Sequence, residues 1–331
     1  FQAEDGIRDS VASRGLGDVY KRQVIIIGGV TTWIAAKGYG MVSKVANWMA
    51  PIIVLAFLAC GLVAAKQLEI KSFSEFFSVW GEGSEPFPGQ MKYTFWHVFL
   101  WSWFCNAAMH IGMSDLSVFR YARSSLSGWT TAAGMYVGHY IAWIAACLLY
   151  AVYLKSPEAA TFLAEGTAPP VAPGPLAFNA IGWFGIIAVI LAGWTTANPT
   201  IYRSGLAFQA ILPKWSITQA TLLAGSVATL AGIFPAFAMK LLDFVAVYGF
   251  ILAPVGAVIV FEYYFAERYG IVKNYAEKHN EVFNKSVFFA WLVSFIFFFG
   301  WSKTQGVFLS FLTLPAWSVS YTHLTLPTKR I

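Results

Sequence analysis

Residues 176–202 read L-A-F-N-A-I-G-W-F-G-I-I-A-V-I-L-A-G-W-T-T-A-N-P-T-I-Y, an apolar run that ends in hydroxyls, an amide and a proline. A run of this length and composition predicts a membrane-spanning helix. Four residues near its end fall at i, i+3, i+4 and i+7 and share one stripe of that helix: Ala192, Thr195, Thr196 and Pro199. Asn198 follows Thr195 by one turn. Polar groups therefore lie where a lipid-facing helix would carry only hydrocarbon.

This polar stretch has two interpretations. Pro199 has no N–H, so the Thr195 carbonyl loses its helical partner beside two hydroxyls. Hydroxyl and free carbonyl oxygens are hard ligands of the type that Na⁺ prefers, and irregular backbone at membrane depth is tolerated where it lines a cavity. The stretch therefore predicts an ion and substrate site. The alternative is a proline-kinked helix whose threonines bond back to their own backbone.

The composition indicates a membrane protein. The chain has 331 residues, of which 58% are hydrophobic and 11% are charged. A soluble domain carries roughly twice that charged fraction, and several apolar runs approach the ~20 residues that span a bilayer. We therefore predict an all-α integral membrane protein, a multi-span helical bundle. The basic residues behind the net charge of +6 lie in loops between spans, so this charge does not indicate nucleic-acid binding.

A short stub at residues 24–36 precedes eight apolar segments. The eight expected spans are residues 48–65, 93–113, 129–154, 176–201, 217–238, 241–265, 287–301 and 307–317. The stretches at 66–93, 155–175 and 267–285 are expected to be loops. Lysine and arginine are more frequent on the side of the loop before Trp48, which predicts that this side is cytoplasmic.

The two ends of the chain differ in character from the spans. Residues 1–23 contain eight charged residues and lack the apolar core and cleavage site of a signal peptide. Residues 318–331 are equally out of character. Both ends resemble translated sequencing-adapter sequence, so we interpret them as non-native and assign residues 24–317 to the membrane domain.

Motifs of catalysis are missing from the sequence. There is no Gly-rich phosphate loop, H-E-x-x-H or C-x-x-C, and the three cysteines, Cys60, Cys105 and Cys147, lie in apolar runs without metal-type spacing. Polar residues instead lie near the middle of two separate spans, which suits transport better than catalysis. We expect that the chain is not an enzyme. A membrane scaffold or a membrane-embedded enzyme is the alternative from another class.

The second polar span lies within residues 96–123, W-H-V-F-L-W-S-W-F-C-N-A-A-M-H-I-G-M-S-D-L-S-V-F-R-Y-A-R. Asn106 and His110 are one turn apart, and Ala107 permits close backbone approach. Trp103 precedes Asn106 by three residues and could provide an aromatic surface for a flat ligand. The alternatives are interhelical hydrogen bonds for the polar pair and ordinary packing for the tryptophan.

Two charged residues follow this span. Asp115 and Arg120 are expected to form an ion pair that marks its cytoplasmic end. A proton-coupling role for Asp115 is the alternative.

Four stretches together resemble the nucleobase–cation symporter family, which includes cytosine permeases, purine permeases and a hydantoin transporter. They are K-G-Y-G-M-V-S-K-V-A-N-W-M-A-P-I at 37–52, S-D-L-S-V-F-R-Y-A-R at 114–123, W-T-T-A-N-P-T-I-Y-R-S-G-L at 194–206 and Y-G-F-I-L-A-P-V-G-A-V-I-V-F-E-Y-Y at 248–264. The stretch at 114–123 resembles the family's D-F-x-R-Y/F-A/G-R signature after the sixth span. The stretch at 194–206 is similar to the W-T-T-N-D-N-A-L-Y-x-x-G-L pattern of the eighth span.

The resemblance implies a five-plus-five inverted repeat around a site at the membrane midplane. The chain would then be incomplete and run from the fourth span to the twelfth. The family's Na⁺ site uses an alanine carbonyl and two hydroxyls in an A-x-x-S/T-T pattern, which Ala192, Thr195 and Thr196 match. Two departures affect the substrate. Ala107 and Ala108 replace a glycine and a stacking tryptophan of the hydantoin transporter, and Asn198 has no equivalent.

The function implied is a symporter that imports a nucleobase or related nitrogen heterocycle with Na⁺ or H⁺ as the coupling ion and without another cofactor. The substrate-binding residues would be Trp103, Asn106, Ala107, His110 and Asn198. We expect a multi-pass protein of the inner or plasma membrane that works as a monomer in the lipid bilayer. A transporter of the same fold for an amino acid or amine is the alternative.

Overall fold

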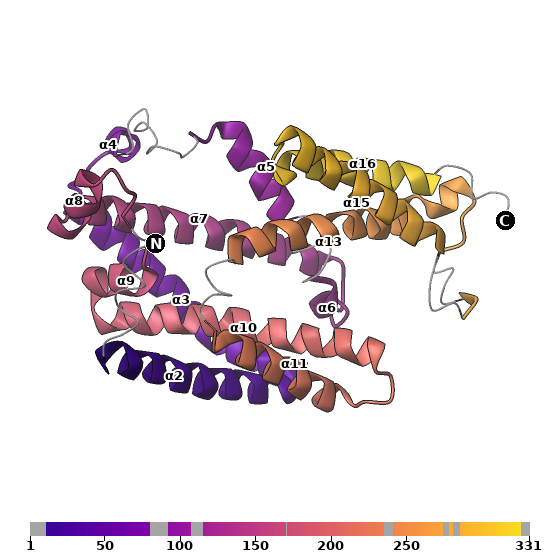
Figure 1. Ribbon diagram of the computed structural model, residues 1–331, viewed down its shortest axis with the longest axis horizontal. Helices are drawn as coiled ribbons and strands as arrows, with labels where there is room; N and C mark the ends of the chain where they lie inside the picture. The colour runs from indigo at the N-terminus through magenta and orange to yellow at the C-terminus, as the bar shows by residue number, and fades with distance from the viewer. Residues whose placement is uncertain are drawn as a thin grey trace. The chain divides into compact units, whose positions relative to one another are not determined.

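Figure 1 shows the computed structural model, which describes residues 11–79, 92–106, 115–169, 171–234, 241–273, 278–280 and 285–325. All the regular elements among these residues are helices. The chain forms two compact units, residues 1–92 with 124–235 and residues 93–123 with 236–331. The all-helical prediction is confirmed for the described residues.

The first unit holds the polar stretch at residues 192–202. Its described helices are α2 (Val11–Ala36), α3 (Tyr39–Gln67), α4 (Phe73–Ser78), α7 (Leu126–Leu154), α8 (Pro157–Ala164), α9 (Pro173–Ile181), α10 (Trp183–Ile211) and α11 (Ile217–Gly232). Helix α10 packs against α2, α3, α9 and α11. Four helices of this unit therefore pack around α10, which carries the polar stretch.

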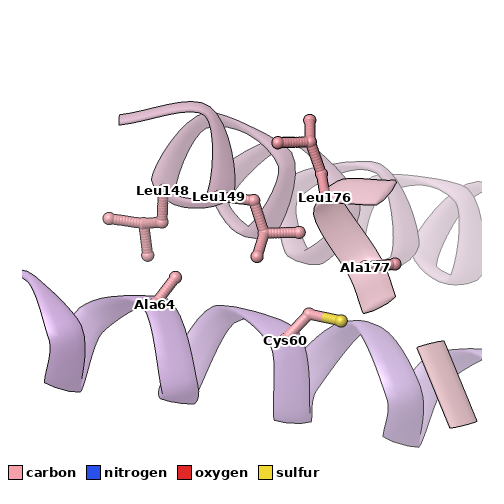
Figure 2. Close-up of a cluster of buried hydrophobic side chains, with 6 residues drawn as sticks. All are labelled: Cys60, Ala64, Leu148, Leu149, Leu176 and Ala177. Carbon is pink, nitrogen blue, oxygen red and sulfur yellow. The ribbon is translucent and has the colours of Figure 1, made fainter. Parts of the chain in front are cut away.

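An apolar cluster joins α3, α7 and α9 at one end of the first unit. Its buried members are Cys60, Ala64, Leu148, Leu149, Leu176 and Ala177. Figure 2 shows Cys60 and Ala64 projecting from α3 toward the leucines of α7. The small side chains on α3 let the two helices approach closely, as is usual where helices pack in a membrane.

The second unit has an aromatic core. Its described helices are α5 (Phe95–Asn106), α6 (Asp115–Phe119), α13 (Leu241–Tyr264), the 3₁₀ helix η2 (Ala266–Tyr269), α15 (Lys285–Gln305) and α16 (Leu309–Thr325). Phe104, Phe250 and Phe298 are buried together in this unit. Gly249 is required beside them, because a Cβ there would lie 2.6 Å from Phe104 Cζ. The Trp291 indole N–H donates to the Ile251 carbonyl at 2.9 Å and so ties α15 to α13.

Five helical segments among the described residues are long and apolar enough to cross a membrane. They are Tyr39–Gln67, Leu126–Leu154, Trp183–Ile211, Val247–Tyr264 and Val287–Gln305. Large apolar side chains such as Trp48 and Leu62 are more than two-thirds exposed, as lipid-facing side chains are. These features are typical of a multi-pass membrane protein.

The expected span at 176–201 is divided in the structure. Gly182 has φ 63° and separates α9 from α10. Residues other than glycine rarely adopt this left-handed conformation, so the chain turns here although the sequence on both sides is apolar. Helix α10 then continues to Ile211, ten residues beyond the expected end.

Two stretches expected to be loops also contain short helices. Helix α4 begins after Ser72, whose side chain accepts from the Glu75 backbone N–H, and the Glu75 carboxylate accepts from the Ser72 N–H in return. Helix α8 begins after Ser156, which accepts from the Ala159 N–H. These caps satisfy N–H groups at the helix starts, which is why polar loop sequence forms helix here.

The expected domain boundaries fall within helices. Helix α2 begins at Val11, before the expected boundary at residue 23, and α16 continues to Thr325, past the boundary at residue 318. The interpretation of residues 1–23 and 318–331 as non-native stays a prediction.

Candidate functional site

Helix α10 carries the candidate site near its middle, at residues 192–199. Pro199 lies inside it, and the helix continues through the proline to Ile211. The predicted polar stretch is therefore a continuous helix that lacks one internal hydrogen bond, because proline has no N–H to donate. Its buried positions include Gly185, Ala188 and Asn198.

The predicted cation ligands meet at one oxygen atom. The hydroxyls of Thr195 and Thr196 each donate to the Ala192 carbonyl at 3.0 Å. Thr195 is half-buried and Thr196 is exposed, so they approach this carbonyl from two sides of the helix. Three neutral oxygens lie together as the A-x-x-T-T spacing predicts. The hydroxyl protons are engaged with the backbone, which is also the arrangement of the alternative interpretation.

Asn198 is a fully buried polar residue of the first unit. Only 1% of its surface is exposed, and among the described residues neither its Oδ1 nor its Nδ2 has a hydrogen-bond partner. Tyr202 lies one turn later on the same face and packs with Ala35 of α2 and Val42 of α3. Asn198 therefore lies on the face of α10 that is covered by α2 and α3.

Trp194 is a polar residue of this face that sequence reasoning missed. Its Nε1 is buried and has no hydrogen-bond partner in the part of the chain that the structure describes. Trp194 precedes Asn198 by four residues, so the two side chains lie on the same face of α10 one turn apart. Their spacing is visible in the sequence, but the burial of the indole nitrogen is not.

Close glycine–threonine contacts fix the helices around this face. A Cβ on Gly28 of α2 would overlap with Thr229 of α11, and one on Gly225 would overlap with Thr32. The pairing of early with late residues shows that α2 and α11 are antiparallel. Gly205 of α10 contacts Thr221 of α11 in the same way. Only residues 212–216 join these two packed helices, so they are antiparallel too. Helices α2 and α10 therefore run in the same direction.

This direction places a further hydroxyl at the depth of Asn198. Ala35 and Tyr202 share one cluster, and Thr31 and Asn198 each lie one turn before them. Thr31 is 2% exposed and donates to the Ile27 carbonyl at 2.6 Å. Its oxygen is thus held by α2 on the same level as the amide.

The second predicted site belongs to the second unit and is described in part. Trp103 lies in α5 and is 39% exposed, while Asn106 is the last residue of that helix. Ala107, Ala108 and His110 lie outside the described residues. The substrate-binding roles expected for this group stay predictions.

Of the predicted ion pair, the structure describes the side chain of Arg120 but not that of Asp115. Asp115 begins α6, and its side chain lies outside the described parts. Arg120 donates to the Tyr121 hydroxyl and lies 4.7 Å from the centre of that ring. The guanidinium is therefore held against an aromatic face.

Within the described ranges, no group of three or more histidine, cysteine, aspartate or glutamate residues could hold a metal ion. The neutral oxygens of α10 remain the candidate ligands. A scan against protein-family models and searches of curated proteins and of solved structures found no match to this chain.

Proposed function

We propose that this chain is part of a secondary transporter of the five-plus-five inverted-repeat type, which imports a nucleobase or related nitrogen heterocycle together with Na⁺ or H⁺. The observation that carries the proposal is Asn198, a buried amide with neither end hydrogen-bonded, one turn from three oxygens that could bind a cation. Polar groups inside a membrane are costly and usually mark a pathway for substrate or ions.

The amide of Asn198 suits a flat heterocycle. It offers a donor and an acceptor side by side in one plane. The ring edge of a nucleobase or hydantoin presents an N–H beside a carbonyl in the same way. Leaving a buried polar group without a partner costs about 1–3 kcal/mol. A substrate that supplies both bonds would recover this free energy, which favours binding of this chemical class.

The oxygens on α10 suit a monovalent cation. The ligands would be the Ala192 carbonyl and the hydroxyls of Thr195 and Thr196. Binding would require both hydroxyl protons to turn away from the carbonyl, so that the three oxygens face the ion. Helix α10 contains no carboxylate, whereas divalent cations are usually bound by carboxylates. Na⁺ is therefore the better candidate.

Further residues complete the proposal. Trp103, Asn106, Ala107 and His110 would form the rest of the substrate pocket, as the family resemblance implies. Trp103 would supply an aromatic surface for stacking. The protein would lie in the inner or plasma membrane and act as a monomer.

Uptake measurements test the cation site. Cells that express the complete gene containing this segment are given radiolabelled uracil, cytosine or hydantoin at graded Na⁺ concentrations. The Thr195→Ala/Thr196→Ala double variant should need at least about tenfold more Na⁺ for half-maximal uptake, since oxygen contacts to a charge contribute about 1.5–3 kcal/mol each.

Matched variants separate a cation role from a structural one. Thr195→Ser/Thr196→Ser keeps both hydroxyls and should behave like the wild type. Thr130→Ala removes a similar backbone-directed hydroxyl from α7, where Thr130 donates to Ser127 at 2.9 Å. It should leave the Na⁺ dependence unchanged. Unaltered Na⁺ dependence in the double alanine variant would refute the cation assignment.

A further inference from the structure

The function proposed above does not use the indole N–H of Trp194. Its Nε1 is buried without a hydrogen-bond partner, on the same face and one turn before the Asn198 amide, which also has none. Three buried polar atoms without partners, Trp194 Nε1, Asn198 Nδ2 and Asn198 Oδ1, thus lie within one turn of a single helix.

Hydrogen-bond inventory limits what these atoms can bind. An indole N–H can only donate, whereas the amide donates through Nδ2 and accepts through Oδ1. The protein therefore offers donors at two atoms and an acceptor at one. A ligand that pairs each of the three atoms with a group of its own presents two acceptors and one donor on one edge.

We infer that Trp194 is a specificity-determining residue that donates its indole N–H to a carbonyl or ring nitrogen of the substrate beside Asn198. This inference rests on the transport function proposed above. Together the two residues select planar heterocycles whose edge carries two acceptors and one donor. The donor of the substrate lies on Asn198 Oδ1, and its acceptors lie on Asn198 Nδ2 and Trp194 Nε1.

The pattern of two acceptors and one donor on one edge distinguishes heterocycles of similar size. Hydantoin and uracil carry an N–H between two carbonyls, and cytosine carries two acceptors beside an amino group. Rotation of the Asn198 amide exchanges its two ends, so both orders of donor and acceptor can be bound. Guanine presents one acceptor and two donors on its corresponding edge. 2-Imidazolidinone has the five-membered ring of hydantoin but only one carbonyl between two N–H groups. With either of the last two ligands, the two protein donors must share one carbonyl oxygen, or one of them stays unpaired.

The neutrality of the set also excludes charged substrates. Trp194 and Asn198 carry no charge, and the neighbouring Thr195 hydroxyl is neutral as well. An amino acid or amine would bring an ammonium group into this buried face without a counter-charge from these residues. Burying an unpaired charge is far more costly than burying a neutral edge.

A pair of ligands tests the role of Trp194. Competition binding of hydantoin and of 2-imidazolidinone is measured on the purified full-length protein, and the ratio of their affinities is taken. The ratio does not depend on the fraction of protein that is correctly folded. In Trp194→Phe the preference for hydantoin should fall about three- to tenfold, the usual range for one hydrogen bond.

A control variant and the opposing outcomes complete the test. Trp183→Phe makes the same substitution at the start of α10, where the tryptophan is 74% exposed, and should leave the ratio unchanged. An unchanged ratio in Trp194→Phe, with hydantoin still bound, would show that Trp194 only packs and would overturn this inference alone. If the wild type binds none of hydantoin, uracil and cytosine, the proposed function fails and the inference fails with it.

Discussion

The contact between α10 and α11 at Gly205 predicts a large effect from one methyl group. In Gly205→Ala the new Cβ would lie 2.8 Å from the Thr221 Cα and 2.9 Å from the Thr221 Cβ. Because one of these atoms is backbone, a side-chain rotation cannot relieve the overlap. The two helices must separate by roughly 0.6 Å to bring 2.8 Å to the 3.4 Å of ordinary contact. Overpacking of this kind costs about 1–3 kcal/mol, and alanine recovers about 1 kcal/mol of helix propensity, so we expect a net loss of up to about 2 kcal/mol.

The stability of Gly205→Ala can be measured by SDS-induced unfolding of the purified protein in mixed micelles. Gly193→Ala is the matched control, since a Cβ at Gly193 on the same helix meets no atom within 4 Å. Thr221→Ala should recover only part of the loss, because it removes side-chain atoms and leaves the Cα in place. If Gly205→Ala is as stable as Gly193→Ala, the reasoning from close helix contact is wrong.

Three further changes should have measurable effects on unfolding in the same assay. Ser216→Ala removes a side chain that caps α11 and should lower the free energy of unfolding by about 1 kcal/mol. Ser125→Ala should cost less, because Ser125 makes no side-chain cap bond to α7. Equal losses in the two variants would contradict this expectation. Trp291→Phe leaves the Ile251 carbonyl without its interhelical donor and should cost about 1 kcal/mol or more; retention of wild-type stability would show that this bond contributes nothing. Gly182→Ala forces a side chain into a conformation with φ 63° and ψ −145°, which is essentially restricted to glycine, and should cost about 1–3 kcal/mol. A stabilising effect would indicate that α9 and α10 can join as one helix.

Apolar runs allowed the membrane helices to be predicted but not their ends. The run from Leu176 onward is hydrophobic on both sides of Gly182, so hydropathy gives no reason to divide it. The division follows from backbone conformation at one glycine. Beyond the apolar part, α10 continues to Ile211 because backbone hydrogen bonding does not depend on hydropathy.

Local spacing along the helix was also sufficient to predict that the hydroxyls of Thr195 and Thr196 lie beside the Ala192 carbonyl. Both threonines reach the Ala192 carbonyl, because i+3 and i+4 hydroxyls point back toward it on any helix. The burial of Asn198 could not be predicted in this way. Its burial depends on α2 and α3, which precede it by more than a hundred residues, and sequence spacing along one helix says nothing about these neighbours.

The same limit explains why Trp194 was missed. A tryptophan in a membrane span is usually packing or an interfacial anchor, and nothing in its sequence context departs from that. Its significance depends on which atoms of the indole are covered. The spacing to Asn198 could have suggested a shared face, but the missing hydrogen-bond partner is visible only in three dimensions.

The antiparallel contact between α2 and α11 also has a consequence for biosynthesis. It joins residues far apart in the chain, since Gly28 of α2 lies against Thr229 of α11, 201 positions later. At about 5–20 residues per second, a ribosome needs roughly 10–40 s to synthesise the intervening chain. During that interval the glycine and threonine surface of α2 has no α11 to pack against. The first unit therefore cannot complete its folding until α11 has been translated.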